Sequence, residues 1–144
     1  MCRRPEVVSW PASFDQKRTW VRHFPGRSFR GYAAPVATRG APGCVAAELL
    51  KHATTADGDY NLLYYRDVDQ FEVDVVIENS AGLLVGVEVK ATASVSERDL
   101  RGLKKLASVA GAQFKMGVVL YDGTETLPLG DGMWAAPLSG LWGR

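Results

Sequence analysis

Two valine-rich segments joined by a short polar break, residues 71–78 (FEVDVVIE) and 83–90 (LLVGVEVK), restrict most strongly what this chain can fold into. Valine favours strands, and the break NSAG at residues 79–82 is typical of a turn. Side chains alternate across a strand, so we expect Glu88 and Lys90 to share one face. The second segment is otherwise apolar on both faces, which predicts a central strand covered on both sides.

The register between these two strands decides whether Asp74 joins the two charges. Residues directly opposite each other in an antiparallel pair lie on one face, so Asp74 shares a face with Glu88 only if the connection has an odd number of unpaired residues. A loop of residues 79–83 brings Asp74 directly opposite Glu88. A register that pairs Glu72 with Glu88 leaves Asp74 one step away diagonally. A two-residue turn would pair Asp74 with Val87 instead.

Either odd connection predicts an acidic pair with a lysine beside it, and such a group has a chemical use. Two carboxylates and the backbone carbonyl of Val89 form the hard oxygen environment that Mg²⁺ or Mn²⁺ prefers, and the ion keeps waters that can be activated. With Lys90 beside the scissile phosphate, the pattern favours hydrolysis of a phosphodiester bond. The alternative is an ordinary cross-strand ion cluster, in which each pair contributes about 0.2 to 1 kcal/mol.

Length and composition limit the broad class of protein. A chain of 144 residues with 47% hydrophobic residues fits one domain with an ordinary core. No apolar run approaches the ~20 residues of a membrane span, and the amino terminus lacks the apolar region of a signal peptide. We therefore expect a soluble, cytoplasmic protein. The cysteines and histidines have no zinc-ligand spacing (Cys2, Cys44, His23, His52).

Charge divides the chain into two parts. Residues 1–40 hold eight Lys and Arg against two Asp and Glu, a net of +6, whereas residues 41–144 hold nine against fourteen, a net of −5. The first part has no sustained period, which predicts a basic, irregular segment with one short helix near residues 15–23. Its arginines and aromatic residues are typical either of a nucleic-acid-binding arm or of a poorly ordered leader.

Two helices are expected beside the strands. Residues 42–53 carry an apolar stripe at helical spacing, with Glu48 at the centre of the segment. A helix acid is usually solvated, so Glu48 joins the site only if this helix packs beside the strand carboxylates. Residues 96–110 form the clearer helix, with Ser96 and, three residues later, Asp99 as a near capping box. Its polar side carries four basic residues: Arg98, Arg101, Lys104 and Lys105. These residues either contact a phosphate backbone or serve solubility.

The remaining strands complete an α/β fold. We expect strands at residues 60–66, 114–121 and 133–136. The strand, helix, strand order of residues 83–121 implies a right-handed crossover to a parallel neighbour. The predicted domain, residues 41–144, is therefore a central mixed sheet, an antiparallel three-stranded meander plus a parallel strand, flanked by helices.

This order of elements, with Asp74 and Glu88-Val89-Lys90 on adjacent strands, resembles the PD-(D/E)XK restriction-endonuclease-like superfamily. More closely, YYRDVDQFEVDVVIE, GLLVGVEVKAT and PLSGLW resemble the C-terminal domain of unknown function of prokaryotic AAA-type P-loop ATPases, over about residues 44–142. The resemblance implies that Asp74 and Glu88 are metal ligands and that Lys90 is the catalytic lysine. It also implies that Glu48 lies on the helix that often supplies a further acid. No GxxxxGK[ST] phosphate loop is present, so this chain is not itself the ATPase.

These observations predict a Mg²⁺-dependent nuclease-like domain that hydrolyses DNA, as a fragment or isolated form of an ATPase-associated protein. Asp74 and Glu88 would hold the ion. Lys90 would orient or deprotonate the water and stabilise the phosphorane charge, and Glu48 would help to position a metal-bound water. The alternative is a catalytically inactive module that binds DNA or a partner protein in an ATPase system, because folds outlive their chemistry. A toxin-like or defence-associated nuclease would share the same chemistry.

Overall fold

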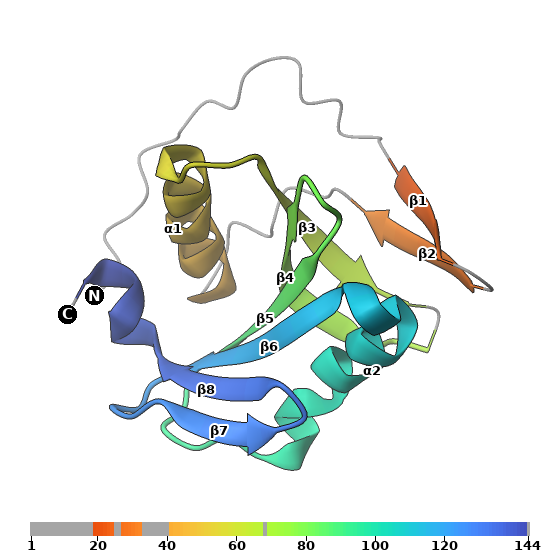
Figure 1. The fold of residues 1–144 in the computed structure, drawn as a ribbon. Coiled ribbons are helices and arrows are strands. Elements are labelled where there is room, and N and C mark those ends of the chain that lie inside the picture. Colours follow the sequence, from red (N-terminus) through yellow and green to blue (C-terminus); the bar gives the residue numbers. More distant parts are fainter. Residues whose placement is uncertain (1–18, 25–26, 33–40, 68, 144) are drawn as a thin grey trace.

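One mixed sheet of eight strands forms the centre of the molecule, and a helix packs on each of its faces (Figure 1). The computed structural model describes residues 19–24, 27–32, 41–67 and 69–143. The strands, in chain order, are β1 (Thr19–Phe24), β2 (Arg27–Tyr32), β3 (Tyr60–Arg66), β4 (Glu72–Asn79), β5 (Leu84–Lys90), β6 (Phe114–Tyr121), β7 (Leu127–Gly130) and β8 (Met133–Pro137). The helical segments are α1 (Ala41–Thr55), η1 (Glu97–Leu100), α2 (Arg101–Ala110), η2 (Gly111–Gln113) and η3 (Leu138–Trp142), where η marks a 3₁₀ turn.

The strand directions confirm the predicted α/β mixed sheet. In space the order is β1-β2-β3-β4-β5-β6-β8-β7. β3, β4 and β5 form the expected antiparallel meander, and β6 lies parallel to β5 after the crossover through η1 and α2. β8 continues the parallel part and β7 returns antiparallel to it. Since β5 is paired on both sides, the prediction of a central strand is also confirmed.

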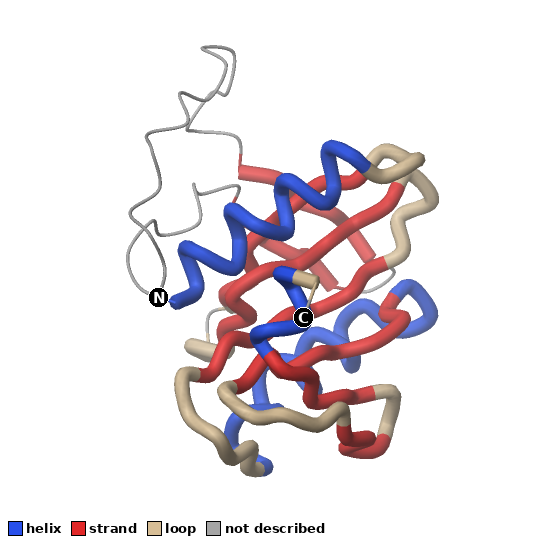
Figure 2. Tube along the Cα trace, turned by 90° about the vertical axis from the view of Figure 1, so that its left-hand side faces the viewer, coloured by secondary structure: helices blue, strands red, loops and turns tan. Residues whose placement is uncertain are grey.

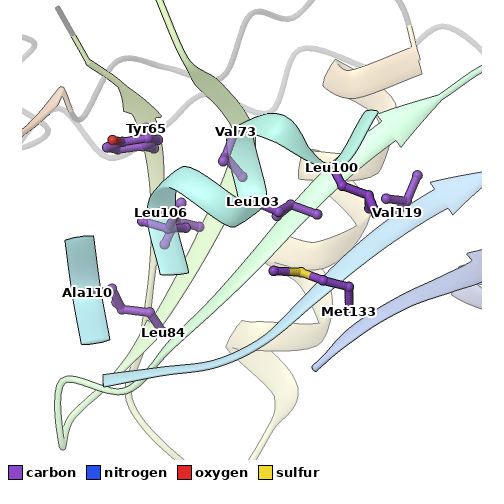
Figure 3. Close-up of a cluster of buried hydrophobic side chains, with 10 residues drawn as sticks. Tyr65, Val73, Leu84, Leu100, Leu103, Leu106, Ala110, Val119 and Met133 are labelled. Carbon is purple, nitrogen blue, oxygen red and sulfur yellow. The ribbon is translucent and has the colours of Figure 1, made fainter. Parts of the chain in front are cut away.

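Each face of the sheet has its own hydrophobic cluster. The cluster under α2 is shown in Figure 3, with these side chains labelled: Tyr65, Val73, Leu84, Leu100, Leu103, Leu106, Ala110, Val119 and Met133. On the other face, Val45 and Ala46 of α1 pack against Val75, Val87 and Leu120. The crossover helix and the first helix therefore cover opposite faces.

Gly86 explains how α2 can lie so close to β5. A Cβ atom at this position would lie 2.6 Å from Cδ2 of Leu103, closer than packed carbon atoms come. A side chain here would therefore push α2 away from the sheet. A glycine inside a strand often marks a close approach of another element, and here that element is α2.

Part of the basic segment is not irregular, contrary to the prediction. β1 and β2 pair with each other, and β2 joins β3 through Gly31 and Tyr32. The predicted helix near residues 15–23 is therefore wrong over residues 19–23, while residues 15–18 lie outside the described residues. Threonine, tryptophan and valine at residues 19–21 favour a strand, and the sheet edge supplies backbone partners that the sequence alone does not reveal. The remaining parts of residues 1–40 also lie outside the described residues.

The C-terminal part adds an edge hairpin and a turn that packs on α1. β7 is a strand that the sequence analysis does not predict, and it pairs with β8 through a tight turn at Asp131 and Gly132. Figure 2 shows η3 on the same side of the sheet as α1, and Nε2 of His52 lies 3.0 Å from the backbone oxygen of Leu141. Among the described helices, none combines the length and the apolar character needed to cross a membrane.

Candidate functional site

The connection between β4 and β5 is the odd loop that puts Asp74 and Glu88 together. Cα partners run from Glu78 with Leu84 to Val75 with Val87, so one further step places Asp74 opposite Glu88. The loop is fixed by Asn79, whose Oδ1 accepts hydrogen bonds from the backbone N–H groups of Ala81 (3.1 Å) and Leu83 (2.9 Å). The predicted loop of residues 79–83 is therefore confirmed, and the register that pairs Glu72 with Glu88 is not adopted.

A β-bulge interrupts β4 at Asp74. Leu63 is paired with Val76 whereas Tyr65 is paired with Val73, so Tyr64 alone opposes both Asp74 and Val75. As a result, Val73 and Val76 both pack in the cluster under α2, although an unbroken strand would place them on opposite faces. A bulge re-aims the side chain that it carries, and bulges often lie next to functional sites.

The Asp74 carboxylate bridges the two strands where their backbone pairing ends. Its Oδ2 accepts a hydrogen bond from the backbone N–H of Val89 at 2.8 Å. Burial raises the pKa of Asp74, the Val89 N–H opposes this shift, and the charge of Glu72 adds to it. The described hydrogen bond of Val89 thus comes from its N–H, while metal binding by its carbonyl stays a prediction.

Glu88 is the least satisfied polar group of the site. Its Oε2 is buried and has no hydrogen-bond partner among the described residues. Burial and the nearby charge of Asp74 raise the pKa of Glu88 to about 8, although the backbone of Asp74 lowers it by hydrogen bonding. A buried carboxylate oxygen without a partner is costly, because desolvation is not repaid.

Lys90 does not contact either of these carboxylates. Its Nζ forms an ion pair with Oδ2 of Asp99, which lies on η1. The same oxygen accepts hydrogen bonds from the backbone N–H and the Oγ of Ser96, each at 2.7 Å. Burial opposes ionisation of Asp99, but the hydrogen bonds from Lys90 and Ser96 prevail and lower its pKa to about 2. We refer to Asp74, Glu88, Lys90 and Asp99 as the strand-end cluster.

The strand-end cluster suits a divalent cation. The unpartnered oxygen of Glu88 and the neighbouring Asp74 carboxylate are hard ligands, and a cation between them would relieve both desolvation and mutual repulsion. Within the described residues, no three His, Cys, Asp or Glu side chains are grouped so as to hold a metal ion. Mg²⁺ is commonly bound by one or two carboxylates with waters and phosphate oxygens, so two protein ligands fit its chemistry.

Glu48 is not brought to the strand-end cluster. Val85, Val87 and Val89 lie with the α1 cluster, so alternation along β5 places Glu88 and Lys90 on the opposite face, under α2. Glu48 belongs to α1, and its Oε2 accepts a hydrogen bond from Nζ of Lys51 at 3.0 Å. The condition for including Glu48, a helix packed beside the strand carboxylates, is not met for Glu88. The sequence could not tell which face the helix covers.

The four basic residues predicted to contact phosphate differ in the partners that their side chains have within the fold. Lys104 pairs with Glu97 at 2.6 Å, and Arg101 lies over the ring of Phe71. Lys105 lies over the same ring and pairs with Asp67 and Asp69, at 3.7 and 3.5 Å. Arg98 is exposed on η1. We refer to Asp67, Asp69, Phe71 and Lys105 as the turn cluster, since its first three members belong to the β3–β4 connection.

Sequence reasoning missed that Asp99 is the partner of Lys90. It identified Asp99 correctly as a capping residue, and the bond from the Ser96 N–H confirms that role. A signal was available in the connection between β5 and η1, which is short enough to keep the capping turn beside the end of the strand. It also did not predict that Tyr64 lies near Glu72 and Asp74. Burial and the charge of Glu72 raise the pKa of Tyr64.

Comparison with known proteins places most of these elements in one family. A family model with the description "Domain of unknown function (DUF4143)" matches residues 42–141. No curated protein matches the sequence at a significant level. The matched region contains β3 to β8 and every member of the strand-end cluster. The chain therefore belongs to the DUF4143 family, whose description assigns no function.

Proposed function

We propose that this protein is a restriction-endonuclease-like domain of the PD-(D/E)XK type that hydrolyses DNA phosphodiester bonds with Mg²⁺ or Mn²⁺. The observation that carries the proposal is the buried Oε2 of Glu88, which has no described partner and lies beside the Asp74 carboxylate. A purely structural ion cluster would normally satisfy such an atom, as buried polar atoms are nearly always hydrogen-bonded. The resemblance to an ATPase-linked domain supports a cytoplasmic role with an ATPase or another protein partner.

The chain's own residues have distinct roles in this proposal. Asp74 and Glu88 bind the cation, and the Val89 N–H holds the Asp74 carboxylate in place. The bound ion supplies Lewis-acid activation of water at neutral pH. Lys90, with its ammonium group paired to Asp99, stabilises the negative charge that develops on the phosphate. Glu48 is left out of this mechanism because α1 lies on the other face of the sheet.

The test combines metal binding with cleavage in the same samples. Mg²⁺ and Mn²⁺ are titrated calorimetrically into the wild-type protein and into the Asp74→Ala, Glu88→Ala double variant, and both are assayed on single- and double-stranded DNA. Loss of both binding and cleavage in the double variant is the expected result. Glu97→Gln is the matched control, since Glu97 is an exposed acid that pairs with Lys104 and not with Lys90.

One outcome favours the alternative function. A folded wild-type protein with no affinity for either metal would contradict the nuclease proposal. DNA binding in EDTA, unchanged in the double variant, would then identify a binding module with a nuclease-like fold. Failure to bind DNA as well would direct the search to protein partners.

A further inference from the structure

Lys90 is close enough to Glu88 to neutralise it, yet it is held elsewhere. Residues two apart on one face of a strand are separated by about 6 to 7 Å, which is within reach of a flexible lysine side chain. Among the described residues, however, the ion pair of Lys90 is with Asp99, and none joins it to Glu88 or Asp74. Lys90 is thus kept apart from the carboxylates of Asp74 and Glu88.

Asp99 is well placed to keep them apart because it is itself fixed. Its Oδ2 is held by two hydrogen bonds from Ser96, both at 2.7 Å. The next residue, Leu100, is 2% exposed and packs in the core under α2. The η1 turn is therefore anchored to the sheet by its apolar residue while its acid holds the lysine. The side chains of Lys90 and Asp99 are 25% and 18% exposed, so solvent weakens this pair only in part.

Without Asp99, Lys90 would lose its ion-pair partner and its ammonium group would be free to bind another acceptor. The buried Oε2 of Glu88, which has no hydrogen-bond partner among the described residues, belongs to a residue on the same face of β5. An ammonium group bound there would occupy the position that a cation needs between Glu88 and Asp74. We propose that Asp99 is a positioning residue that holds Lys90 away from Glu88 and so keeps the Asp74–Glu88 pair open to a divalent cation. The metal-binding part of this inference rests on the proposed function, but the restraint on Lys90 does not.

Four proteins test the restraint without any metal: wild type, Lys90→Met, Asp99→Asn and the Asp99→Asn, Lys90→Met double variant. Asparagine retains an oxygen that can accept the Ser96 N–H bond, so the capping turn is disturbed as little as possible. The ¹³C resonance of the Glu88 side-chain carboxyl is recorded at one pH in EDTA. We expect Lys90→Met to shift it little in the wild-type background and strongly in the Asp99→Asn background. Equal shifts in both backgrounds would overturn the proposal.

The same four proteins are then titrated with Mn²⁺. Asp99→Asn should weaken Mn²⁺ binding by about 10- to 100-fold, the range found when a residue that orients a metal site is lost. Adding Lys90→Met should restore most of that affinity, because the competing ammonium group is gone. A merely structural role of Asp99 predicts that Lys90→Met changes Mn²⁺ affinity by the same factor in the wild-type and the Asp99→Asn backgrounds. Glu97→Gln, an acid-to-amide change on the same turn, should leave Mn²⁺ affinity unchanged.

The two measurements separate the possible failures. No Mn²⁺ binding in the wild type, together with the expected pattern of carboxyl shifts, would refute the nuclease proposal and leave the restraint on Lys90 standing. Mn²⁺ binding that Asp99→Asn weakens without rescue by Lys90→Met would refute the positioning role and leave the metal site standing.

Discussion

Two charged clusters lie beside the η1–α2 segment, and they differ in how completely their groups are satisfied. In the turn cluster, Asp67 accepts hydrogen bonds at 2.9 Å from the N–H groups of Asp69 and Phe71, and a further one from Tyr65. Lys105 pairs with both acids and covers the ring of Phe71. In the strand-end cluster, Lys90 and Asp99 are paired, but one oxygen of Glu88 has no hydrogen-bond partner in the part of the chain that the structure describes. The first cluster joins the β3–β4 connection to α2, whereas the second leaves a buried carboxylate oxygen without a partner among the described residues.

The largest expected effect is on stability as a function of pH, and it concerns Glu88. A carboxyl whose pKa rises from 4.5 to about 8 on folding binds more protons in the folded state, so stability is lost as pH rises through this interval. Removing the charge by Glu88→Gln should abolish that loss, worth at most about 5 kcal/mol. Urea unfolding in EDTA at pH 5 and pH 8.5 measures it. An equal pH dependence in both proteins would show that Glu88 is not the unsatisfied group.

The second-largest effect is expected on the rate of DNA cleavage when Lys90 is replaced. In the proposed mechanism Lys90 stabilises the charge on the phosphate, so Lys90→Ala should lower the rate by at least about 100-fold while the far-ultraviolet circular dichroism spectrum stays unchanged. The comparison with the turn cluster is direct, since Lys105→Ala removes a lysine charge from the middle of α2, outside the strand-end cluster. An unchanged rate in Lys90→Ala would remove this lysine from the mechanism.

A smaller effect is expected from the turn cluster itself. Lys105→Met abolishes two ion pairs and a cation–π contact, and its side chain is 28% exposed, so the free energy of unfolding should fall by about 1 kcal/mol. Metal affinity should stay at the wild-type value, because the turn cluster has no part in binding the ion. Calorimetric titration with Mn²⁺ and urea unfolding of the same preparation distinguish the two properties.

The smallest effect is predicted for Lys104, which pairs with the largely exposed Glu97. Lys104→Met should leave the unfolding midpoint unchanged, as exposed ion pairs add little. If Lys104 contacts a DNA backbone, the variant should nevertheless bind DNA more weakly and with a shallower dependence on salt. Binding assays at several salt concentrations measure this, and identical slopes for both proteins would exclude the phosphate contact.

Local sequence patterns predicted those parts of the fold whose secondary structure depends on residues close together in the sequence. The limits of β3 and β6 agree with the expected segments, and the loop that pairs Asp74 with Glu88 is one of the connections that parity and the polar break left open. The face covered by α1 could not be predicted, because an amphipathic helix fits either side of a sheet that is apolar on both. The bulge at Asp74 depends on the pairing of β3 with β4 and leaves no mark in the sequence of β4 alone.

Two misses had different causes. β7 could have been predicted from the sequence, since Asp131 and Gly132 form the Asp-Gly pair typical of a two-residue hairpin, and both have positive φ angles (50° and 74°). For the pairing of Lys90 with Asp99, the short connection between β5 and η1 indicates only that the two residues lie near each other, and the pairing itself depends on the path of the chain through that connection and on how Leu100 docks in the core. Sequence periodicity carries no information on that path.

The loop held by Asn79 gives the chain an unusual sensitivity to length. Surface connections ordinarily accept insertions and deletions at small cost. Here the number of residues between Glu78 and Leu84 decides which side chain of β5 stands opposite Asp74. Adding or removing one residue, while the loop keeps the same number of unpaired residues, would shift the register by one and put a valine there in place of Glu88. A change of two residues would again place, opposite Asp74, a β5 residue whose side chain lies on the same face as Glu88. In this loop, whether a length is odd or even matters more than the length itself.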